Sequence, residues 1–167
     1  MNTIAVDTLM AQTRRLAALY RQTTGQTLPV SAELSRYDAA QLLGLSVISG
    51  APRAGVDFTG SQGPYHCKNI QVKSRVIFND NNSGYRIGQL NLSMPWEIVV
   101  LVLYEANYEP FAIYAATKEE VIASLSQTTH KQARGAMSLA KFKAISQLIW
   151  TRERGLEWDE SLSNQAS

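Results

Sequence analysis

Apolar residues recur at helical spacing in two segments near the N-terminal end of the chain. The first segment spans residues 2–24 and has apolar positions at Leu9, Leu16, Leu19 and Tyr20. Gly25 suits the C-terminal end of this helix, because glycine readily adopts the left-handed backbone conformation. A second helix is predicted over residues 29–43, where Pro29 suits the first turn and Gly44 suits the exit.

The spacing of apolar residues then changes to that of β-strands. Short strands are predicted at residues 45–48 and 56–60, and a long strand is predicted at residues 66–78. The apolar residues of the long strand that share one parity are Ile70, Val72, Val76 and Phe78. Residues 98–104 (IVVLVLY) are nearly all apolar, as in a strand that is covered on both faces. We therefore place this strand at the centre of the sheet.

The C-terminal third is predicted to add one strand and two helices. A strand at residues 111–115 precedes the sequence TKEE at 117–120, which matches a capping box and starts a helix that ends near Leu125. A last helix is predicted over residues 138–154, with apolar positions at Leu139, Phe142, Ile145, Leu148 and Ile149. The strands are therefore followed, as well as preceded, by helices.

Length and composition fit a single globular domain. The chain has 167 residues, of which 45% are hydrophobic and 18% are charged. With the order of elements, these values predict one α/β domain over residues 1–158, built on a mixed central sheet flanked by helices. Residues 159–167 are polar and are predicted to form a disordered tail. The single cysteine excludes an internal disulfide.

Charge and hydropathy exclude some locations and leave others open. No apolar run reaches the ~20 residues of a membrane helix, and Asp7 and two arginines interrupt any secretory segment at the N-terminus. We therefore predict no membrane partner and a cytoplasmic location. The net charge of +2 is too small to indicate nucleic-acid binding by itself. Several cations nevertheless gather around the middle strands: Lys68, Lys73, Arg75 and Arg86.

Asp57, Gln71 and Lys73 are candidate site residues because of their side-chain types and their spacing. Side chains alternate between the two faces of a strand, so Gln71 and Lys73 point the same way while Ile70 and Val72 face the core. If the two strands form a hairpin, Asp57 can reach the same face. A carboxylate, an amide oxygen and an ammonium group then surround one small volume.

This set of groups suits phosphodiester hydrolysis with a hard cation. Mg²⁺ or Mn²⁺ prefers carboxylate, carbonyl and water oxygens, so the predicted ligands are Asp57, Gln71 and the carbonyl of Val72. Lys73 is predicted to orient or deprotonate the attacking water and to stabilise charge on the phosphate. The metal would polarise the phosphoryl oxygen and lower the pKa of its bound water.

The stretch GVDF…NIQVKSR resembles the core of the PD-(D/E)xK, or restriction endonuclease-like, superfamily. Its VD takes the PD place and its QVK takes the (D/E)xK place, and the glutamine resembles the QxK motif of the Mrr-type branch. In many members a preceding helix supplies a further glutamate, and Glu33 lies where that residue is expected. The resemblance covers about residues 30–125. It implies a metal-dependent endonuclease acting on DNA, of the restriction or defence type.

The resemblance also implies partners and roles. Asp57, Gln71, Lys73 and Glu33 would be catalytic, with Glu33 as a further metal ligand. DNA contacts are predicted at Lys68, Arg75 and Arg86. Because nucleases of this type need two sites to cut both strands, a two-fold homodimer is predicted, with its interface at residues 1–28 and 138–158.

Each candidate residue also has an ordinary structural explanation. Asp57 beside Gly60 suits a turn, Lys73 and Arg75 suit a solvated strand face, and Glu33 suits the first turn of a helix. Two other functions therefore stay open. One is a non-catalytic protein of the same fold that binds nucleic acid or a partner protein, and the other is a small structural or assembly protein.

Overall fold

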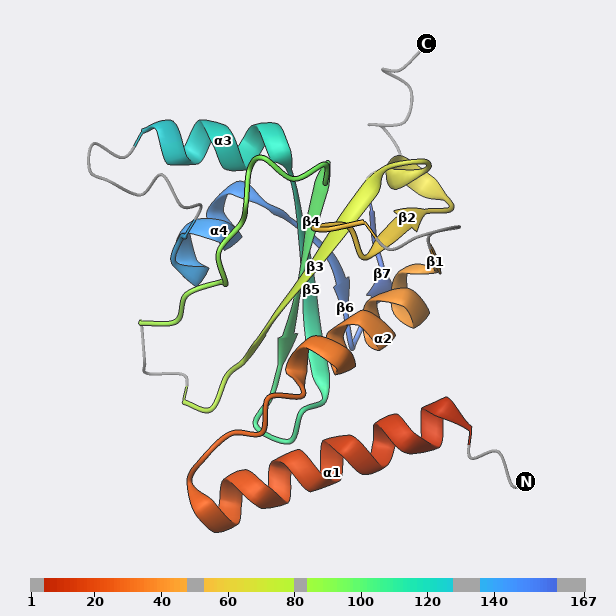
Figure 1. The fold of residues 1–167 in the computed structure, drawn as a ribbon, viewed down its shortest axis with the longest axis vertical. Helices are drawn as coiled ribbons and strands as arrows, with labels where there is room; N and C mark the ends of the chain where they lie inside the picture. Colours follow the sequence, from red (N-terminus) through yellow and green to blue (C-terminus); the bar gives the residue numbers. More distant parts are fainter. Residues whose placement is uncertain (1–4, 48–52, 80–83, 128–135, 159–167) are drawn as a thin grey trace.

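The computed structural model describes residues 5–47, 53–79, 84–127 and 136–158. It consists of one mixed sheet with helices on both sides (Figure 1). The elements are α1 (Val6–Thr24), α2 (Ser31–Leu43), β1 (Leu45–Val47), β2 (Phe58–Gly60), the 3-10 helix η1 (Gly63–Tyr65), β3 (Asn69–Val76), β4 (Ile98–Tyr104), β5 (Pro110–Thr117), α3 (Lys118–Ser126), α4 (Leu139–Ile145), β6 (Gln147–Thr151) and β7 (Gly155–Leu156).

The seven strands lie in the sheet in sequence order, from β1 to β7. Neighbouring strands are antiparallel except β3 and β4, which run parallel. A parallel pair needs a long crossover connection, which residues 77–97 supply. The described part of this crossover contains no helix, yet it buries Ile87, Leu90 and Trp96 against one face of the sheet.

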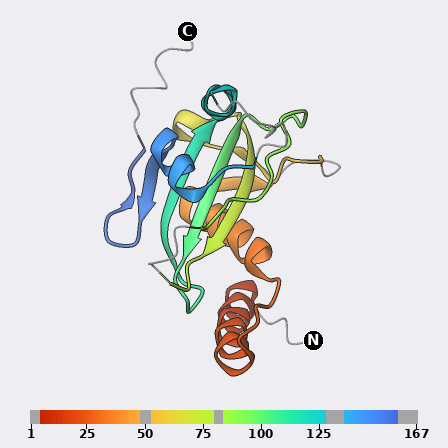
Figure 2. The same cartoon turned by 90° about the vertical axis from the view of Figure 1, so that its left-hand side faces the viewer.

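Strand β4 lies at the centre of the molecule, and all its residues from Ile98 to Tyr104 are buried. Val100 and Val102 belong to the core under α1 and α2, whereas Val99 and Leu101 belong to the core under α3 and α4. Figure 1 shows α3 and α4 on one side of the strands and α2 on the other, and in Figure 2 α4 lies in front of the strands and α2 behind them. The predicted strand with both faces covered is therefore confirmed.

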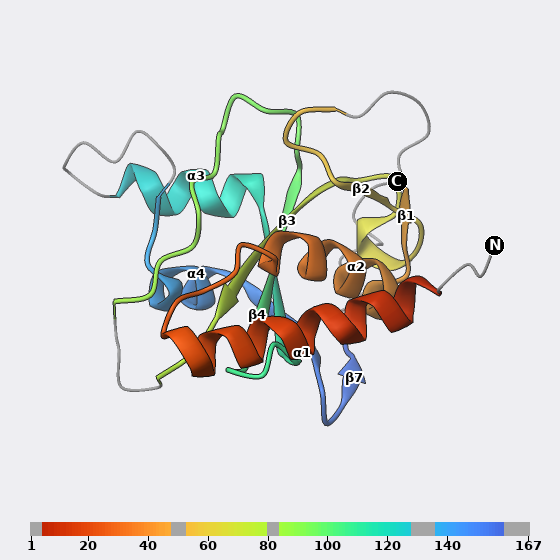
Figure 3. The same ribbon diagram turned by 60° about the horizontal axis from the view of Figure 1, so that its bottom comes forward.

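Helix α1 lies alongside α2 (Figure 3) and is attached through a buried polar network. Arg14 pairs with Asp38 and donates to the carbonyl of Tyr108 at 2.8 Å, while the hydroxyl of Tyr104 donates to Asp38 at 2.5 Å. Burial raises the pKa of Tyr104, and the charge of Asp38 raises it further. Removing one partner of such a pair would leave a buried charge unpaired, which is costly. Among the described residues, no helix has both the length and the apolar character that a membrane crossing requires.

Most predicted elements are present, but the last predicted helix is wrong. The helices at 6–24 and 31–43 and the capping box at the start of α3 confirm the predictions. Helix α4 ends at Ile145, and β6 occupies most of the remaining segment predicted as helix, before β7 begins at Gly155. β6 pairs with β5, which would otherwise be the edge of the sheet. The predicted tail at residues 159–167 lies outside the described residues.

Candidate active site

Asp57 lies where strand β2 stops covering the edge of β3. Only Phe58 and Thr59 of β2 are in register with β3, and the N–H of Asp57 donates to the carbonyl of Ile70 at 2.8 Å. Two residues further along β3, the N–H of Val72 donates to Oδ2 of Asp57 at 2.7 Å. The Asp57 side chain therefore accepts a hydrogen bond that the backbone of a longer β2 would otherwise accept. Beyond this point β2 no longer pairs with the edge of β3.

Gln71, Lys73 and Arg75 project from one face of β3. Their register partners on β4 are the alternate residues that belong to the core under α3 and α4. Ile70 and Val76 have the opposite parity and belong to the other core. The predicted alternation of faces along this strand is therefore confirmed.

A cavity of about 420 Å³ opens at the uncovered edge of β3. Its walls come from β3, from the start of α2 and from Gly88 in the crossover. The predicted site residues that line it are Asp57, Gln71, Val72 and Lys73. The fold therefore brings a carboxylate, an amide and an ammonium group to one cavity.

Lys73 holds its ammonium group in a partly buried position. Burial lowers the pKa of Lys73, and the nearby carboxylate of Asp57 opposes this effect without cancelling it. A Cβ atom built on Gly88 would lie 3.8 Å from Lys73 Nζ, so the crossover backbone passes close to this group. A lysine with a lowered pKa loses its proton more readily than an exposed one, which suits a proton acceptor.

Arg36 is a second cation at Asp57, and the sequence analysis missed it. Its Nη1 lies 3.9 Å from Asp57 Oδ1, and its Nη2 pairs with Glu33. The sequence does contain one indication of this position. Glu33 and Arg36 are three residues apart in a predicted helix, which places both side chains on one face of that helix. Any cation bound by Asp57 would share this carboxylate with Arg36.

The oxygen atoms around the cavity are of the kind that bind a hard cation such as Mg²⁺. Gln71 Oε1 is buried and has no hydrogen-bond partner among the described residues, so a buried acceptor is left to bind a cation. The carbonyl of Val72 faces the same edge as its N–H, because both groups of a strand residue point to one side. Within the described ranges, no three His, Cys, Asp or Glu side chains form a metal-binding group. A metal here would therefore depend on Asp57, two neutral oxygens and water.

The other predicted site residues are spread more widely. Glu33 does not line the cavity; its side chain is 67% exposed and pairs with Arg36. Lys68 is exposed, with its Nζ 3.4 Å from Glu97 Oε1, and Arg86 is exposed within the crossover. Arg75 alone of the three predicted DNA contacts lines the cavity.

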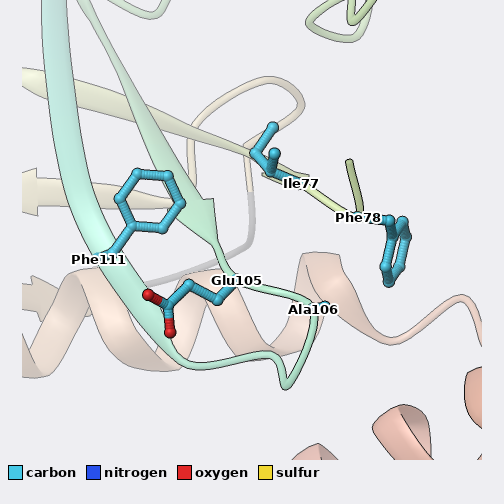
Figure 4. Close-up of a pocket in the computed structure, with 5 residues that line it drawn as sticks. All are labelled: Ile77, Phe78, Glu105, Ala106 and Phe111. Carbon is cyan, nitrogen blue, oxygen red and sulfur yellow. The ribbon is translucent and has the colours of Figure 1, made fainter. Parts of the chain in front are cut away.

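A separate cavity of about 390 Å³ lies past the C-terminal ends of β3 and β4 (Figure 4). Its lining consists of Ile77, Phe78, Ala106, Phe111 and Glu105. Glu105 is the only charged residue among the described residues of that lining, and it pairs with Arg152 at 3.2 Å. This cavity lacks the combination of groups found around Asp57, so the cavity at the β3 edge is the candidate active site.

In comparisons with known proteins, no family profile matches the chain and no curated protein matches it. The assignment of a function therefore depends on the residues and the geometry of the site.

Proposed function

We propose that this protein is a metal-dependent endonuclease that hydrolyses DNA phosphodiester bonds, with a restriction endonuclease-like core. The observation that carries the proposal is the grouping of Asp57, Gln71 and Lys73 around one cavity at the uncovered edge of β3. The buried oxygen of Gln71, which has no partner among the described residues, supports a cation at this position. A lysine with a lowered pKa beside it supports proton transfer.

Each residue has a distinct role in the proposed reaction. Asp57, Gln71 and the carbonyl of Val72 would hold Mg²⁺ or Mn²⁺, which supplies charge neutralisation at the phosphoryl oxygen and a water of lower pKa. Lys73 orients the attacking water and, in its neutral form, accepts a proton from it. The water oxygen then bonds to phosphorus, the bond to the leaving oxygen breaks, and that oxygen takes a proton from solvent.

DNA cleavage by the wild type and by Asp57→Ala, with Mg²⁺ and with chelator, tests this proposal. Cleavage should require the metal and should be lost in the variant, because Asp57 supplies the only carboxylate among the described residues that line the cavity. Glu33 stays a predicted ligand, but its carboxylate would have to leave Arg36 to reach the site.

A non-catalytic protein of the same fold, which binds nucleic acid or a partner protein, is the second candidate. One observation favours it: the guanidinium of Arg36 already lies 3.9 Å from the carboxylate on which metal binding depends. The neutral side chain of Gln71 adds no charge to replace it. Such a protein would bind DNA equally well with and without metal, and it would not cleave.

The proposal includes a two-fold homodimer located in the cytoplasm. An enzyme that cuts both strands of a duplex needs two sites, and the described part of one copy provides one cavity with this set of groups. Helix α1 supports an interface because it exposes a set of apolar side chains: Val6, Leu9, Leu16 and Leu19. Exposed apolar residues that gather on one element are typical of interaction surfaces.

A further inference from the structure

The candidate active site continues into a second cavity of about 430 Å³ along the edge of β3. The two cavities adjoin each other, because both are lined by Ser31, Ser74 and Arg75, and the pair is here named the β3-edge groove. In the opposite direction, the pairing of β2 with β3 covers the edge. The groove therefore extends from Asp57 in one direction only.

Cations dominate the β3-edge groove. Among the described residues, the charged groups that line it are Arg36, Lys73, Arg75, Arg21 and Asp57, of which Asp57 alone is acidic. Positive charge concentrated in a groove attracts anions and raises their local concentration. The groove is therefore suited to a ligand that carries more than one negative charge.

Arg75 lies at the junction of the two cavities and has an unsatisfied donor. Its Nε is buried and has no hydrogen-bond partner among the described residues. Buried polar groups are nearly always hydrogen-bonded, and the planar guanidinium of arginine matches the oxygens of a phosphate. A phosphate at the junction would supply the missing acceptor.

The far end of the groove contains further donors that the fold holds in place. The guanidinium of Arg21 lies over the ring of Phe78, with Cζ 4.5 Å from the ring centre, and it donates to the carbonyl of Gly25. The hydroxyl of Tyr85 accepts the N–H of Phe78 at 2.9 Å, which leaves its own proton to donate. These groups place donors beyond Arg75 in the same direction along the groove.

We propose that Arg75 binds a second phosphate of the nucleic-acid strand whose scissile phosphate lies at Asp57 and Lys73, and that the strand leaves the site along the β3-edge groove. This inference rests on the proposed function, because it takes the scissile phosphate as its starting point. A polynucleotide is the favoured occupant, since its phosphates repeat along a chain as the cations repeat along the groove. Free phosphate would occupy only one of these positions.

Binding of a labelled DNA duplex in chelator, followed by fluorescence anisotropy, tests the inference apart from cleavage. Arg75→Gln should weaken binding about tenfold, the effect of losing one charge-assisted contact. It should also lower the slope of log Kd against log salt by about one, because one fewer phosphate is neutralised. Arg154→Gln is the matched control and should leave both quantities unchanged, since Arg154 is exposed and pairs with Glu157 at 3.6 Å.

Unchanged affinity and slope in Arg75→Gln, or no DNA binding by the wild type, would overturn the inference. Inorganic phosphate that competes as well as an oligonucleotide of equal phosphate content would also overturn it. Circular dichroism checks the fold of the variant. If Arg75→Gln does not fold, the binding of the wild type to duplexes with neutral methylphosphonate linkages is measured instead. Affinity should then fall only when the neutral linkages lie on one side of the cleavage site.

The two proposals fail in different ways. If DNA binding depends on Arg75 but the wild type cleaves nothing, the proposed enzyme activity is wrong and the phosphate site stands. If cleavage depends on Asp57 but Arg75→Gln binds and cleaves normally, the phosphate site is wrong and the proposed activity stands.

Discussion

Lys73 is the proposed proton acceptor of the site, and its ammonium group is partly buried, which is unfavourable for a charge. Burial lowers its pKa, which means that the folded protein disfavours the ammonium form relative to the unfolded chain. The Asp57 carboxylate offsets only part of this effect. Residues that destabilise a fold in this way are common in active sites.

Lys73→Met should stabilise the protein at neutral pH while removing activity. The gain in the free energy of unfolding should be on the order of 1 kcal/mol, since a desolvated charge is replaced by an apolar side chain of similar length. The gain should shrink as pH rises toward 10.5, the ordinary pKa of lysine, because the wild-type side chain then becomes neutral in the folded state before it does so in the unfolded state.

Urea denaturation of both proteins across this pH range measures the difference. Lys68→Met is the control, because Lys68 is exposed and its loss should change stability by no more than about 0.5 kcal/mol. A lower stability of Lys73→Met at neutral pH would mean that the attraction to Asp57 outweighs the cost of burial.

At the scale of elements, strand parity in β3 was predictable, while the C-terminal strands were not. Ile70 and Val76 alternate with polar residues, so a period of two is visible in the sequence. Leu139, Phe142, Ile145 and the residues that follow also fit a helical period, although the structure ends the helix at Ile145. A short apolar run fits either element, and the choice here depends on pairing with β5, a contact distant in sequence.

The same limit applies to the candidate site. The positions of Gln71 and Lys73 relative to each other follow from strand geometry alone. The approach of Arg36 to Asp57 depends on how α2 packs beside β3, which no local pattern contains. The β3-edge groove likewise depends on where β2 stops, because only Phe58 and Thr59 of β2 pair with β3, at its start.

Gly60, the last residue of β2, lies close to the backbone of Tyr65 in η1. A Cβ atom at Gly60 would lie 1.8 Å from the carbonyl oxygen of Tyr65, so the backbone would have to move. Gly60→Ala should lower the free energy of unfolding by about 1–3 kcal/mol, the usual cost of overpacking.

Thermal denaturation of Gly60→Ala beside Gly88→Ala measures this effect. Gly88 is the matched control, because the atom nearest to a Cβ there would be Lys73 Nζ at 3.8 Å, an ordinary contact distance. Equal melting temperatures for the two variants would show that Gly60 is not constrained as described.

At the scale of the whole molecule, α1 links the fold to its proposed assembly. Its inner side carries Arg14 and Ala17, its only buried residues, whereas Leu16 and Leu19 on its outer side are 59% and 60% exposed. A helix with apolar side chains on its solvent side suits packing against a second copy.

Leu16→Glu should convert the proposed homodimer into a monomer, because a charge would enter the centre of an apolar interface. Light scattering after size-exclusion chromatography should show the mass falling from two chains to one. Ile122→Glu, at an exposed apolar position on α3, is the control and should remain dimeric. A wild type that is monomeric at high concentration would contradict the assembly.

Cleavage of supercoiled plasmid DNA by proteins purified in parallel is the decisive test of the proposed endonuclease activity. The wild type should nick or linearise the plasmid in Mg²⁺ or Mn²⁺ and stop when chelator is added. Asp57→Ala should be inactive, whereas Gln71→Glu should keep activity because it places an acid where the amide oxygen was. DNA that stays intact with the wild type in either metal, or cleavage that is equal in Asp57→Ala, would contradict the account.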